Sequence, residues 1–410
     1  MVHGGACLVR LEDGTTVLVD GAIPGERVVL ELGHRSHGSW FGRAVDILDP
    51  SPQRTVPPCP YVPDCGGCDL QHVEYSHQLN LKREIVADAL RRARVPLDDG
   101  LIEVHGMETP WAYRWRGEFH VIPGPQGLRD ATLGFNRARS WRPVAVERCL
   151  IHHDSVNDCL PALRDAVRAG GSTGLTVLHV TVGEDGGELL VRGRPRAALA
   201  PSAVDDASLG LPAGRRLSTH STALSWRGQS FRVVPEAFIQ VSWSQMDLLY
   251  SCVLQGLGAV EGRRIIDAYA GIGVLAALLA AAGAEVVCIE ENRAAATLGV
   301  RNAELNGVSE RVHYRAETVE SALPSVGSEP PVDAVILDPP RAGCDRRVVA
   351  WLALAGPPRM VYVSCDPATL ARDLSVLTGS GPYRIERFHM VDMFPQTHHV
   401  ESAVILSREA

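Results

Sequence analysis

The sequence predicts an α/β protein: a doubly wound, mostly parallel sheet forms the C-terminal part, behind a small N-terminal β-barrel and a central α+β domain. Two observations predict this class. After residue 230, four short apolar runs alternate with segments of helical length, as in repeated strand–helix units. Before residue 50, apolar and polar residues alternate between Asp-Gly turns, which is typical of short paired strands. We therefore divide the chain into residues 1–52, 53–225 and 226–410.

Length and composition restrict the functional classes. The chain has 410 residues, 45% of them hydrophobic and 21% charged, an ordinary composition for a globular protein of two or three domains. No apolar run is long enough to cross a bilayer, and the first residues lack the regions of a signal peptide. We expect a cytoplasmic protein with no membrane partner. The formal net charge of −8 does not favour a nucleic acid partner, although a local basic groove would suffice for one.

The elements before the C-terminal sheet are expected from local patterns. Val17 and Val19 mark one face of a strand in the N-terminal barrel. A helix is expected over residues 75–94, where apolar residues recur at helical spacing. Residues 192–215 are rich in Ala, Pro and Ser and are expected to form a loose connection.

Four of the ten cysteines have a spacing that indicates a metal site. Without a secretion signal, a disulfide framework is not expected. Cys59, Cys65 and Cys68 are clustered around two glycines, and Cys149 is remote. These thiolates suit Zn²⁺ or a [4Fe–4S] cluster, and three clustered cysteines with a remote fourth are closer to the cluster pattern than to the paired cysteines of structural zinc. Five others lack such spacing and are expected to serve in packing: Cys7, Cys159, Cys252, Cys288 and Cys344.

The first apolar run of the C-terminal part leads into a glycine turn, Asp267-Ala-Tyr269-Ala-Gly271-Ile-Gly273, that opens a helix. Such glycines let the backbone approach a ligand at the helix N-terminus. Glu290 ends the next run, where an acid can hold both hydroxyls of a ribose. Because Asp267 would repel a phosphate, the turn favours a cationic nucleoside over a dinucleotide. S-adenosylmethionine has a ribose, an ammonium and a sulfonium, and it fits this pattern.

Two further strand ends carry reactive groups. Asp338 precedes two prolines that stiffen its turn. Cys365 stands at the start of a helix, where a thiol pKa is expected to be lowered. A thiolate beside a sulfonium suggests addition to C6 of a pyrimidine, which makes C5 nucleophilic toward the methyl group. The C5 proton then requires a general base. Glu401, ahead of the last apolar run, is the candidate, with His398 and His399 as rivals or as a pair without a chemical role.

A polar cluster precedes the sheet and suggests contacts to a base. The side-chain amide of Gln240 can donate and accept at once, which suits the imide edge of uracil. Phe238 can stack on a base that is flipped out of its helix. The alternative is that this cluster only caps a helix and forms part of its apolar face.

Together these motifs resemble the bacterial RNA uracil-C5 methyltransferases, the family that makes 5-methyluridine in tRNA and 23S rRNA. The matching stretches cover about residues 225–410 in the order of the family: FIQVS, DAYAGIG, EEN, RNAELNG, DPPRAG, VSCDPATLARD and THHVE. The resemblance implies a Rossmann-like class I methyltransferase domain that binds S-adenosylmethionine. Ser242, where the family usually has Asn, and Val274, where it often has a polar residue, depart from the pattern.

The resemblance also assigns roles to residues. It makes Cys365 the nucleophile and Glu401 the base. The other assigned residues bind ligands: Gln240 and Asp338 where uracil and cofactor meet, and Tyr269 and Glu290 on S-adenosylmethionine. A cytosine-C5 methyltransferase also uses a cysteine, but the DPPRAG turn and the late glutamate argue against it. A protein that only binds or folds RNA would not need the full set.

The N-terminal parts extend the resemblance. Residues 1–52 are similar to a TRAM domain, an OB-like barrel that binds RNA. Ribosomal members of the family carry a [4Fe–4S] cluster on the arrangement seen at Cys59, Cys65, Cys68 and Cys149, which implies a structural or RNA-positioning cluster here. These features favour 23S rRNA as the target and leave tRNA position 54 open. We expect a monomer.

Overall fold

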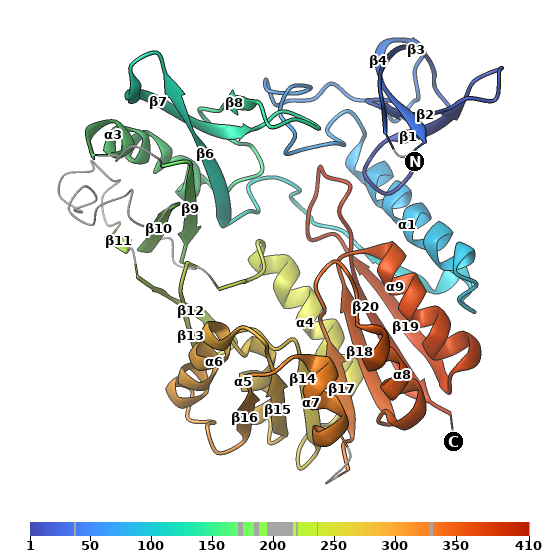
Figure 1. Ribbon diagram of the computed structural model, residues 1–410, viewed down its shortest axis with the longest axis vertical. Coiled ribbons are helices and arrows are strands. Elements are labelled where there is room, and N and C mark those ends of the chain that lie inside the picture. Colours follow the sequence, from blue (N-terminus) through green and yellow to red (C-terminus); the bar gives the residue numbers. More distant parts are fainter. Residues whose placement is uncertain are drawn as a thin grey trace.

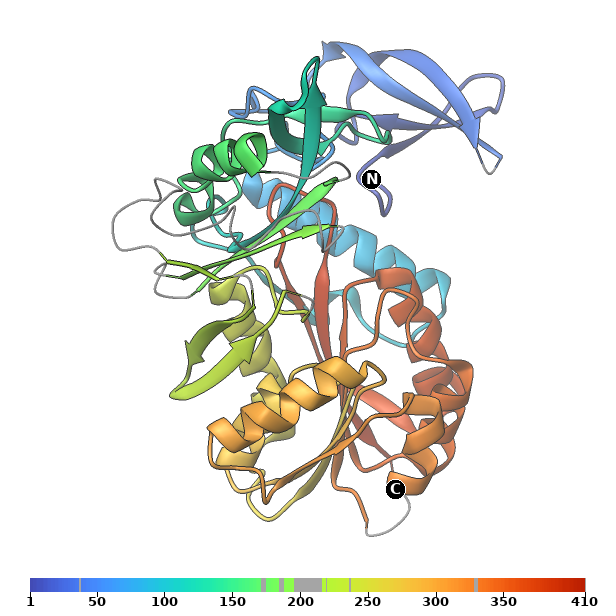
Figure 2. The same ribbon diagram turned by 60° about the vertical axis from the view of Figure 1, so that its left-hand side comes forward.

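The computed structural model describes residues 1–36, 38–170, 175–183, 188–194, 216–218, 220–235, 237–327 and 331–409. The expected loose connection over 192–215 lies outside the described residues from 195 onward. The chain forms an N-terminal sheet, a central and mostly antiparallel sheet, and a large C-terminal sheet, which Figure 1 shows from blue to red along the sequence. Turned by 60°, the same chain shows the N-terminal sheet at the end of the molecule opposite the C-terminus (Figure 2).

The N-terminal part is a four-stranded sheet in the order β1-β2-β4-β3. Its strands are β1 (Cys7–Arg10), β2 (Thr16–Asp20), β3 (Arg27–Ser36) and β4 (Ser39–Asp49). Val17 and Val19 are fully buried in its small core, as their spacing predicts. The recorded pairings leave β1 and β3 as edge strands, so the expected barrel is an open sheet among the described residues.

The central region is built on a six-stranded sheet in the order β11-β10-β9-β6-β7-β8. Its strands are β6 (Arg116–Gly124), β7 (Gly127–Asn136), β8 (Pro143–Ala145), β9 (Val177–Val182), β10 (Glu188–Arg194) and β11 (Arg216–Ser218). Helices α2 (Asp154–Asn157) and α3 (Leu160–Gly170) pack on it, and the hairpin of β12 (Thr222–Trp226) and β13 (Gln229–Val233) leads to the C-terminal part.

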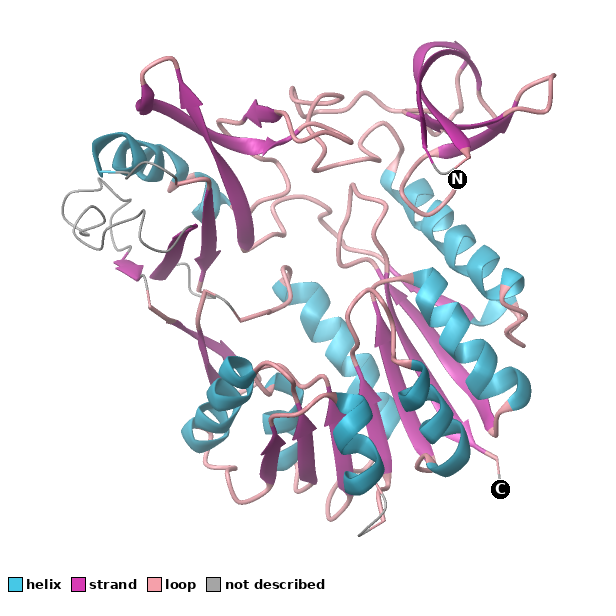
Figure 3. Cartoon of the chain, viewed as in Figure 1, coloured by secondary structure: helices cyan, strands magenta, loops and turns pink. Residues whose placement is uncertain are grey.

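The C-terminal part is the predicted doubly wound sheet, in the order β16-β15-β14-β17-β18-β20-β19-β5 (Figure 3). Its strands are β5 (Ile102–His105), β14 (Arg264–Ala268), β15 (Glu285–Ile289), β16 (Val312–Arg315), β17 (Ala334–Leu337), β18 (Arg359–Ser364), β19 (Tyr383–Val391) and β20 (Glu401–Arg408). Only β20 runs antiparallel to its neighbours, and all four predicted apolar runs are buried strands.

Helices cover both faces of this sheet, so each strand is buried on two sides and reads as a continuous apolar run. On one face lie α4 (Trp243–Leu257), α5 (Val274–Ala281) and α6 (Arg293–Leu305). On the other lie α1 (Tyr75–Arg92), α7 (Val319–Val326), α8 (Arg346–Ala355) and α9 (Pro367–Leu374). A short π-helical turn, Ser375–Ser380, follows α9.

The segment from α1 to β5 belongs to the C-terminal sheet in space. Val86 and Leu90 of α1 pack into its core, and β5 pairs with β19 as its last strand. Buried Lys82 of α1 donates to Asp392 Oδ1 at 2.6 Å, beyond the end of β19. A domain boundary at residue 53 groups this helix and strand with the central region, whereas their contacts are with the C-terminal core. No helix among the described residues is long and apolar enough to cross a membrane.

Candidate active site

The carboxyl ends of the parallel strands border a cavity of about 630 Å³. All seven residues that the sequence suggests for catalysis and ligand binding line it: Phe238, Gln240, Tyr269, Glu290, Asp338, Cys365 and Glu401. They come from the ends of β14, β15, β17 and β18, from the start of β20 and from the segment before α4. The topology explains the convergence, since parallel strands end at one edge and ligands of such sheets bind there.

The glycine turn after β14 adopts the conformation that its residues suggest. Gly271 and Gly273 have φ of +54° and +80°, and Gly273 precedes the first residue of α5. Tyr269 also has a positive φ, +67°, a strained conformation for a residue with a bulky side chain. The amides of Tyr269 and Ala270 both donate to the carbonyl of Ile289 at the end of β15. This turn is therefore held against β15, the strand that directly precedes Glu290, which is predicted to bind the ribose.

Glu290 is fixed by two backbone donors. Its Oε2 accepts from the amide of Gly271 at 2.9 Å, and its Oε1 accepts from the amide of Asn292 at 2.8 Å. Each carboxylate oxygen has a further lone pair, so the two oxygens can still accept from two hydroxyls. The geometry is suited to the neighbouring hydroxyls of a ribose.

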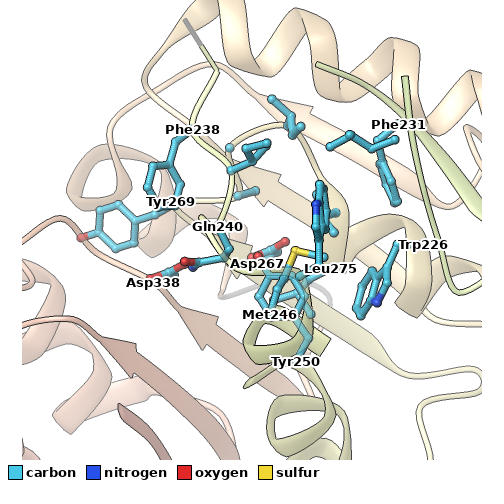
Figure 4. A pocket seen from close by; sticks show the side chains of 17 residues that line it. Trp226, Phe231, Phe238, Gln240, Met246, Tyr250, Asp267, Tyr269, Leu275 and Asp338 are labelled. Atoms are coloured by element: carbon cyan, nitrogen blue, oxygen red, sulfur yellow. The ribbon is translucent and has the colours of Figure 1, made fainter. Parts of the chain in front are cut away.

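A second cavity adjoins the first behind Gln240 and holds Asp267 (Figure 4). Gln240 is 5% exposed, and Figure 4 shows its side chain between Asp267 and Asp338. Burial, together with the charge of Asp338, raises the pKa of Asp267 to about 8. Burial raises the pKa of Asp338 to about 6. Phe238, by contrast, is 70% exposed at the rim, where its ring is available to a partner.

The cavity around these residues is rich in acids. Glu290, Glu291, Glu320, Asp338, Asp345 and Glu401 all contribute to its lining. Among the described residues that line the cavity, Arg341 is the one arginine, and there is no lysine. Such a surface repels phosphate and favours a positively charged ligand. The expectation of a cationic nucleoside therefore has a counterpart in the shape and charge of the site.

Cys365 follows the last residue of β18 and precedes α9, as predicted, but its expected acidity is wrong. The carboxylate of Asp366 takes the helix N-terminus by accepting from the amides of Ala368 and Thr369 at 3.0 and 2.9 Å. The thiol is instead half-buried near carboxylates. Burial and the charge of Glu401 raise the pKa of Cys365 to about 11, against the lowering effect of Arg341. The helix terminus does not reach the sulfur because a better acceptor occupies it.

Glu401 is the first residue of β20 and lies beside the end of β18, since Ser402 pairs with Ser364 in the antiparallel register. Its side chain is 3% exposed. Burial, with the charge of Asp338, raises the pKa of Glu401 well above its ordinary value. A carboxylate with a raised pKa is the stronger base.

The two rival bases are occupied or too weak. His398 Nδ1 lies at hydrogen-bonding distance, 2.6 Å, from Asp69 Oδ2, and His398 does not line the cavity. His399 lines the cavity, but burial and the charges of His398 and Arg341 lower its pKa to about 3. An imidazole that holds a proton so weakly is a poor general base at neutral pH. The geometry favours Glu401.

Sequence reasoning missed a contact that crosses the site. Arg341 Nη2 lies 3.1 Å from His399 Nδ1, which joins the turn after β17 to the segment before β20. The charge of Arg341 also opposes the rise in the pKa of Cys365 and of Glu401 that burial causes. The sequence signal was the Arg that follows the two prolines of the DPPRAG turn.

The predicted metal ligands form a separate cavity in the central region. Cys59, Cys65, Cys68 and Cys149 line one volume of about 150 Å³ together with Arg114. Burial raises the pKa of Cys68 to about 12 and that of Cys149 to about 11, with further contributions from the neighbouring thiols. Thiols that resist ionisation alone can be held as thiolates by a bound metal. The remaining five cysteines, apart from Cys365, are buried as expected.

Comparisons with known proteins decide the family. The model of the tRNA (uracil-5-)-methyltransferase family matches residues 222–409. An uncharacterized RNA methyltransferase of Gloeobacter violaceus is 33% identical over an alignment that covers 100% of this chain and 95% of that protein. One from Streptomyces coelicolor is 32% identical, with 100% and 92% covered. The chain belongs to the RNA uracil-C5 methyltransferase family. It is therefore an S-adenosylmethionine-dependent enzyme, and the alternatives of a cytosine-C5 enzyme and a pure RNA-binding protein are excluded.

A solved structure agrees with the fold over the whole length. It is the tRNA (uracil-54, C5)-methyltransferase of Pyrococcus abyssi, determined with S-adenosyl-L-homocysteine. The two chains superpose with a TM-score of 0.71 at 24% identity, over 98% of this chain and 100% of that one. This similarity confirms the predicted arrangement of a class I methyltransferase domain behind two smaller regions.

Proposed function

We propose that this RNA uracil-C5 methyltransferase works through a covalent bond between Cys365 and C6 of the target uracil, with Glu401 as the base. The observation that carries the proposal is the cavity in which the thiol of Cys365, the carboxyls of Asp338 and Glu401 and the glutamate proposed to bind ribose meet at one sheet edge. Neither a nucleophile without a base nor a base without a methyl donor would methylate an unactivated pyrimidine carbon.

S-adenosylmethionine is proposed to lie along the glycine turn. Glu290 would accept from both ribose hydroxyls, since each of its oxygens keeps a free lone pair. The ring of Tyr269, which lines both cavities, would border the nucleoside. Asp267 and Asp338 would face the ammonium and the sulfonium side of the donor. The cation would favour their ionised forms and so compensate for their burial.

The steps balance as follows. The Cys365 thiolate forms a bond to C6, and the C5–C6 π electrons move onto C5 and the neighbouring carbonyl. C5 then attacks the methyl group, and the electron pair of the broken C–S bond neutralises the sulfonium. Glu401 removes the proton from C5, so that the C5–C6 double bond re-forms and the thiolate leaves. Arg341 would favour the thiolate and the carboxylate, because its charge offsets part of the rise that burial causes in the pKa of Cys365 and of Glu401.

The uracil must be flipped out of its stack to reach this depth, at an expected cost of a few kcal/mol. Phe238 at the rim is placed to stack on the flipped base, and buried Gln240 is placed to pair with its imide edge. Asp338 lies where base and donor would meet. Together these contacts would stabilise the nucleotide in its flipped-out conformation.

The N-terminal sheet and the β7–β8 connection form a second region for RNA. Arg139 of this connection pairs with Asp20 of β2 at 2.7 Å, and its guanidinium lies 4.8 Å from the ring centre of Phe41 in β4. Trp141 on the same connection is 91% exposed, among further arginines. An exposed aromatic ring with neighbouring guanidinium groups is a platform for unpaired bases. A TRAM-like role for residues 1–52 in RNA binding fits this arrangement.

We propose a [4Fe–4S] cluster on Cys59, Cys65, Cys68 and Cys149. A single tetrahedral Zn²⁺ with bonds near 2.3 Å places its sulfur ligands roughly 3.8 Å apart. In the described part of the chain, no three of these four sulfurs lie within 4.8 Å of one another. The cavity therefore suits a larger group, and Arg114 in its lining would offset the negative charge of a thiolate-bound cluster. Its role would be to hold the loops around it rather than to transfer electrons.

The RNA target is proposed to be 23S rRNA, on the strength of the cysteine set, with tRNA position 54 as the alternative. The alternative has support in the Pyrococcus abyssi enzyme, whose fold is shared and which acts on tRNA uracil 54. We propose that the protein acts as a cytoplasmic monomer.

One experiment tests mechanism and target together. The full-length protein and its Cys365→Ala variant would be expressed in a strain that lacks the gene, and 5-methyluridine would be mapped in 23S rRNA and in tRNA. The proposal expects the wild type to restore 5-methyluridine in 23S rRNA. The Cys365→Ala variant should restore it in neither 23S rRNA nor tRNA. Return of the mark only in tRNA would shift the target to position 54. Full methylation by Cys365→Ser would overturn the covalent mechanism.

A further inference from the structure

A third cluster of metal-ligand side chains lies away from both cavities. One ligand atom from each of His105, Cys252 and His389 can be chosen so that all three lie within 4.8 Å of one another. His105 ends β5, His389 lies on β19 and Cys252 lies on α4. None of the three lines the active-site cavity or the cysteine cavity.

The register of the sheet explains why these side chains meet. In the parallel pairing of β5 with β19, Glu103 lies opposite His389 and His105 lies opposite Val391. Residues two apart on a strand point to the same face, so Glu103, His105 and His389 share one face. That face is covered by α4, because Val391 and Cys252 belong to one apolar core. The backbone therefore directs two imidazoles, a thiol and a carboxylate toward one point.

The distances agree with a shared ion. His105 Nε2 lies 3.1 Å from His389 Nδ1, and Glu103 Oε2 lies 3.3 Å from the same His389 nitrogen. In a tetrahedral zinc site, bonds of about 2.0 Å to nitrogen and 2.3 Å to sulfur place neighbouring ligand atoms roughly 3.3–3.6 Å apart. Because the thiol lies within 4.8 Å of the two nitrogens, it would have to approach them by no more than about 1.3 Å to complete the set around an ion.

We propose that His105, Cys252 and His389 bind a divalent transition metal of the Zn²⁺ class, with Glu103 or a water molecule as the fourth ligand. Two imidazoles, one thiolate and one oxygen form a donor set that zinc accepts and that magnesium or calcium does not. Cys252 is 4% exposed and His389 is 3% exposed, so the ion would be largely shielded from solvent. Glu103, half exposed, marks the side from which an ion would enter.

The proposed ion would fasten an edge strand. β5 pairs with a single neighbour and is followed at once by the chain that leads into the central region. A metal that links β5 and β19 to α4 would add bonds from three elements where the sheet alone supplies one ladder. The site would therefore act on stability and on the placement of the central region, and it is independent of the proposed methyl transfer.

Metal content of the full-length protein tests the site. Zinc per chain would be measured by elemental analysis after dialysis against a small excess of Zn²⁺, for the wild type, for Cys252→Ala and for His105→Gln. Cys159→Ala is the matched control, since Cys159 is also a buried cysteine but lies in the central core. The proposal expects both site variants to hold one zinc fewer than the wild type and than the control. Equal zinc content in all four proteins would overturn it.

Cobalt substitution separates this site from the cysteine cavity. Co²⁺ at the proposed site should show a thiolate-to-metal charge-transfer band and the intense visible bands of tetrahedral coordination. These bands should survive in Cys68→Ala, whose cysteine cavity is disrupted, and disappear when Cys252→Ala is added to that variant. If Cys252→Ala does not fold, His105→Gln provides the same comparison, because its half-buried side chain ends an edge strand. Unchanged bands in the folded site variant would show that the two histidines and the thiol only pack together.

Discussion

The active-site cavity and the cysteine cavity differ in how they are built and in what they can hold. The first has about 630 Å³, is lined by carboxyls and is formed by strand ends of one sheet. The second has about 150 Å³, is lined by thiols and is formed by loops that come together in the central region. A large acidic site suits ligands that come and go, whereas a small thiol site suits a resident group. Disrupting the active-site cavity should therefore reduce activity, whereas disrupting the cysteine cavity should reduce stability.

Cys365→Ala is expected to show the largest difference between loss of activity and loss of stability. Removing the nucleophile should reduce methyl transfer at least about a thousandfold, because no other group in the cavity can form the covalent bond to C6. Fluorescence-monitored binding of S-adenosylmethionine and the melting temperature should stay close to wild type, since Cys365 is only partly buried. Cys159→Ala is the control for loss of a cysteine away from the cavity. Residual turnover within tenfold of wild type would refute the assigned nucleophile.

Glu401→Gln should stop the reaction one step later. The amide keeps the size of the side chain but cannot take the C5 proton, so turnover should fall by roughly 10²–10⁴-fold. The methylated adduct would then persist, and a covalent protein–RNA band should accumulate in denaturing gels. Glu304→Gln, on the exposed side of α6, should form no such band. Slow turnover without any adduct would point to a role before methyl transfer.

Cys68→Ala should give the opposite profile. Loss of one ligand should release the cluster and destabilise the loops around it, lowering the free energy of unfolding by about 3 kcal/mol or more. The affinity for S-adenosylmethionine should change less than about twofold, because the two cavities share no lining residue. Iron analysis, calorimetry and donor titration on the same preparation would measure all three quantities. A loss of donor binding as large as the loss of stability would show that the two regions are coupled.

The sequence predicted the residues of both cavities for different reasons. Asp338, Cys365 and Glu290 could be found because parallel strands end at one edge, so a residue that ends an apolar run is already placed. The four thiols could be found because their spacing indicates a shared metal. In both cases a general rule about a residue pattern predicts which side chains meet in space.

Two kinds of feature could not be predicted from the sequence. One is which side chain occupies a helix N-terminus, and the other is which distant strands pair. The thiol pKa of Cys365 was expected to fall at a helix N-terminus, but Asp366 occupies that terminus and nearby carboxyls raise the pKa. The pairing of β5 with β19 joins strands almost 290 residues apart, and no local pattern indicates it. For the same reason Cys252 was read as a packing residue, since its histidine neighbours come from that pairing.

A smaller effect is expected outside both cavities, at Trp141. Base–aromatic stacking contributes about 1–3 kcal/mol per base, so Trp141→Ala should raise the KM for RNA roughly tenfold. The affinity for S-adenosylmethionine should be unchanged, because the hollow that Trp141 lines shares no residue with the active-site cavity. Leu354→Ala, on exposed α8, controls for loss of a surface apolar side chain. Equal KM values for the two variants would remove Trp141 from the RNA-binding surface.

The smallest effect is a pH dependence that only the acidic cavity should show. In the free enzyme the pKa of Asp267 is about 8 and that of Asp338 about 6, both raised by burial. A cationic donor favours the ionised carboxyls, so its binding should release protons, and its affinity should rise with pH between about 6 and 8 and then level off. S-adenosylhomocysteine lacks the sulfonium charge and should show a shallower rise. Titration calorimetry in buffers of different ionisation enthalpy would count the protons.

The same shifts predict how the free enzyme responds to pH. Because folding raises these pKa values above those of the unfolded chain, the stability they contribute is complete at acidic pH and is lost as pH rises through about 6 and then 8. Bound S-adenosylmethionine should offset that loss, so the melting temperatures of free and bound enzyme should diverge toward pH 8. Asp267→Asn removes the carboxyl with the higher of these two pKa values and should flatten the divergence above pH 7. A divergence that persists unchanged in this variant would assign the protons to another carboxyl, with Glu401 the next to substitute.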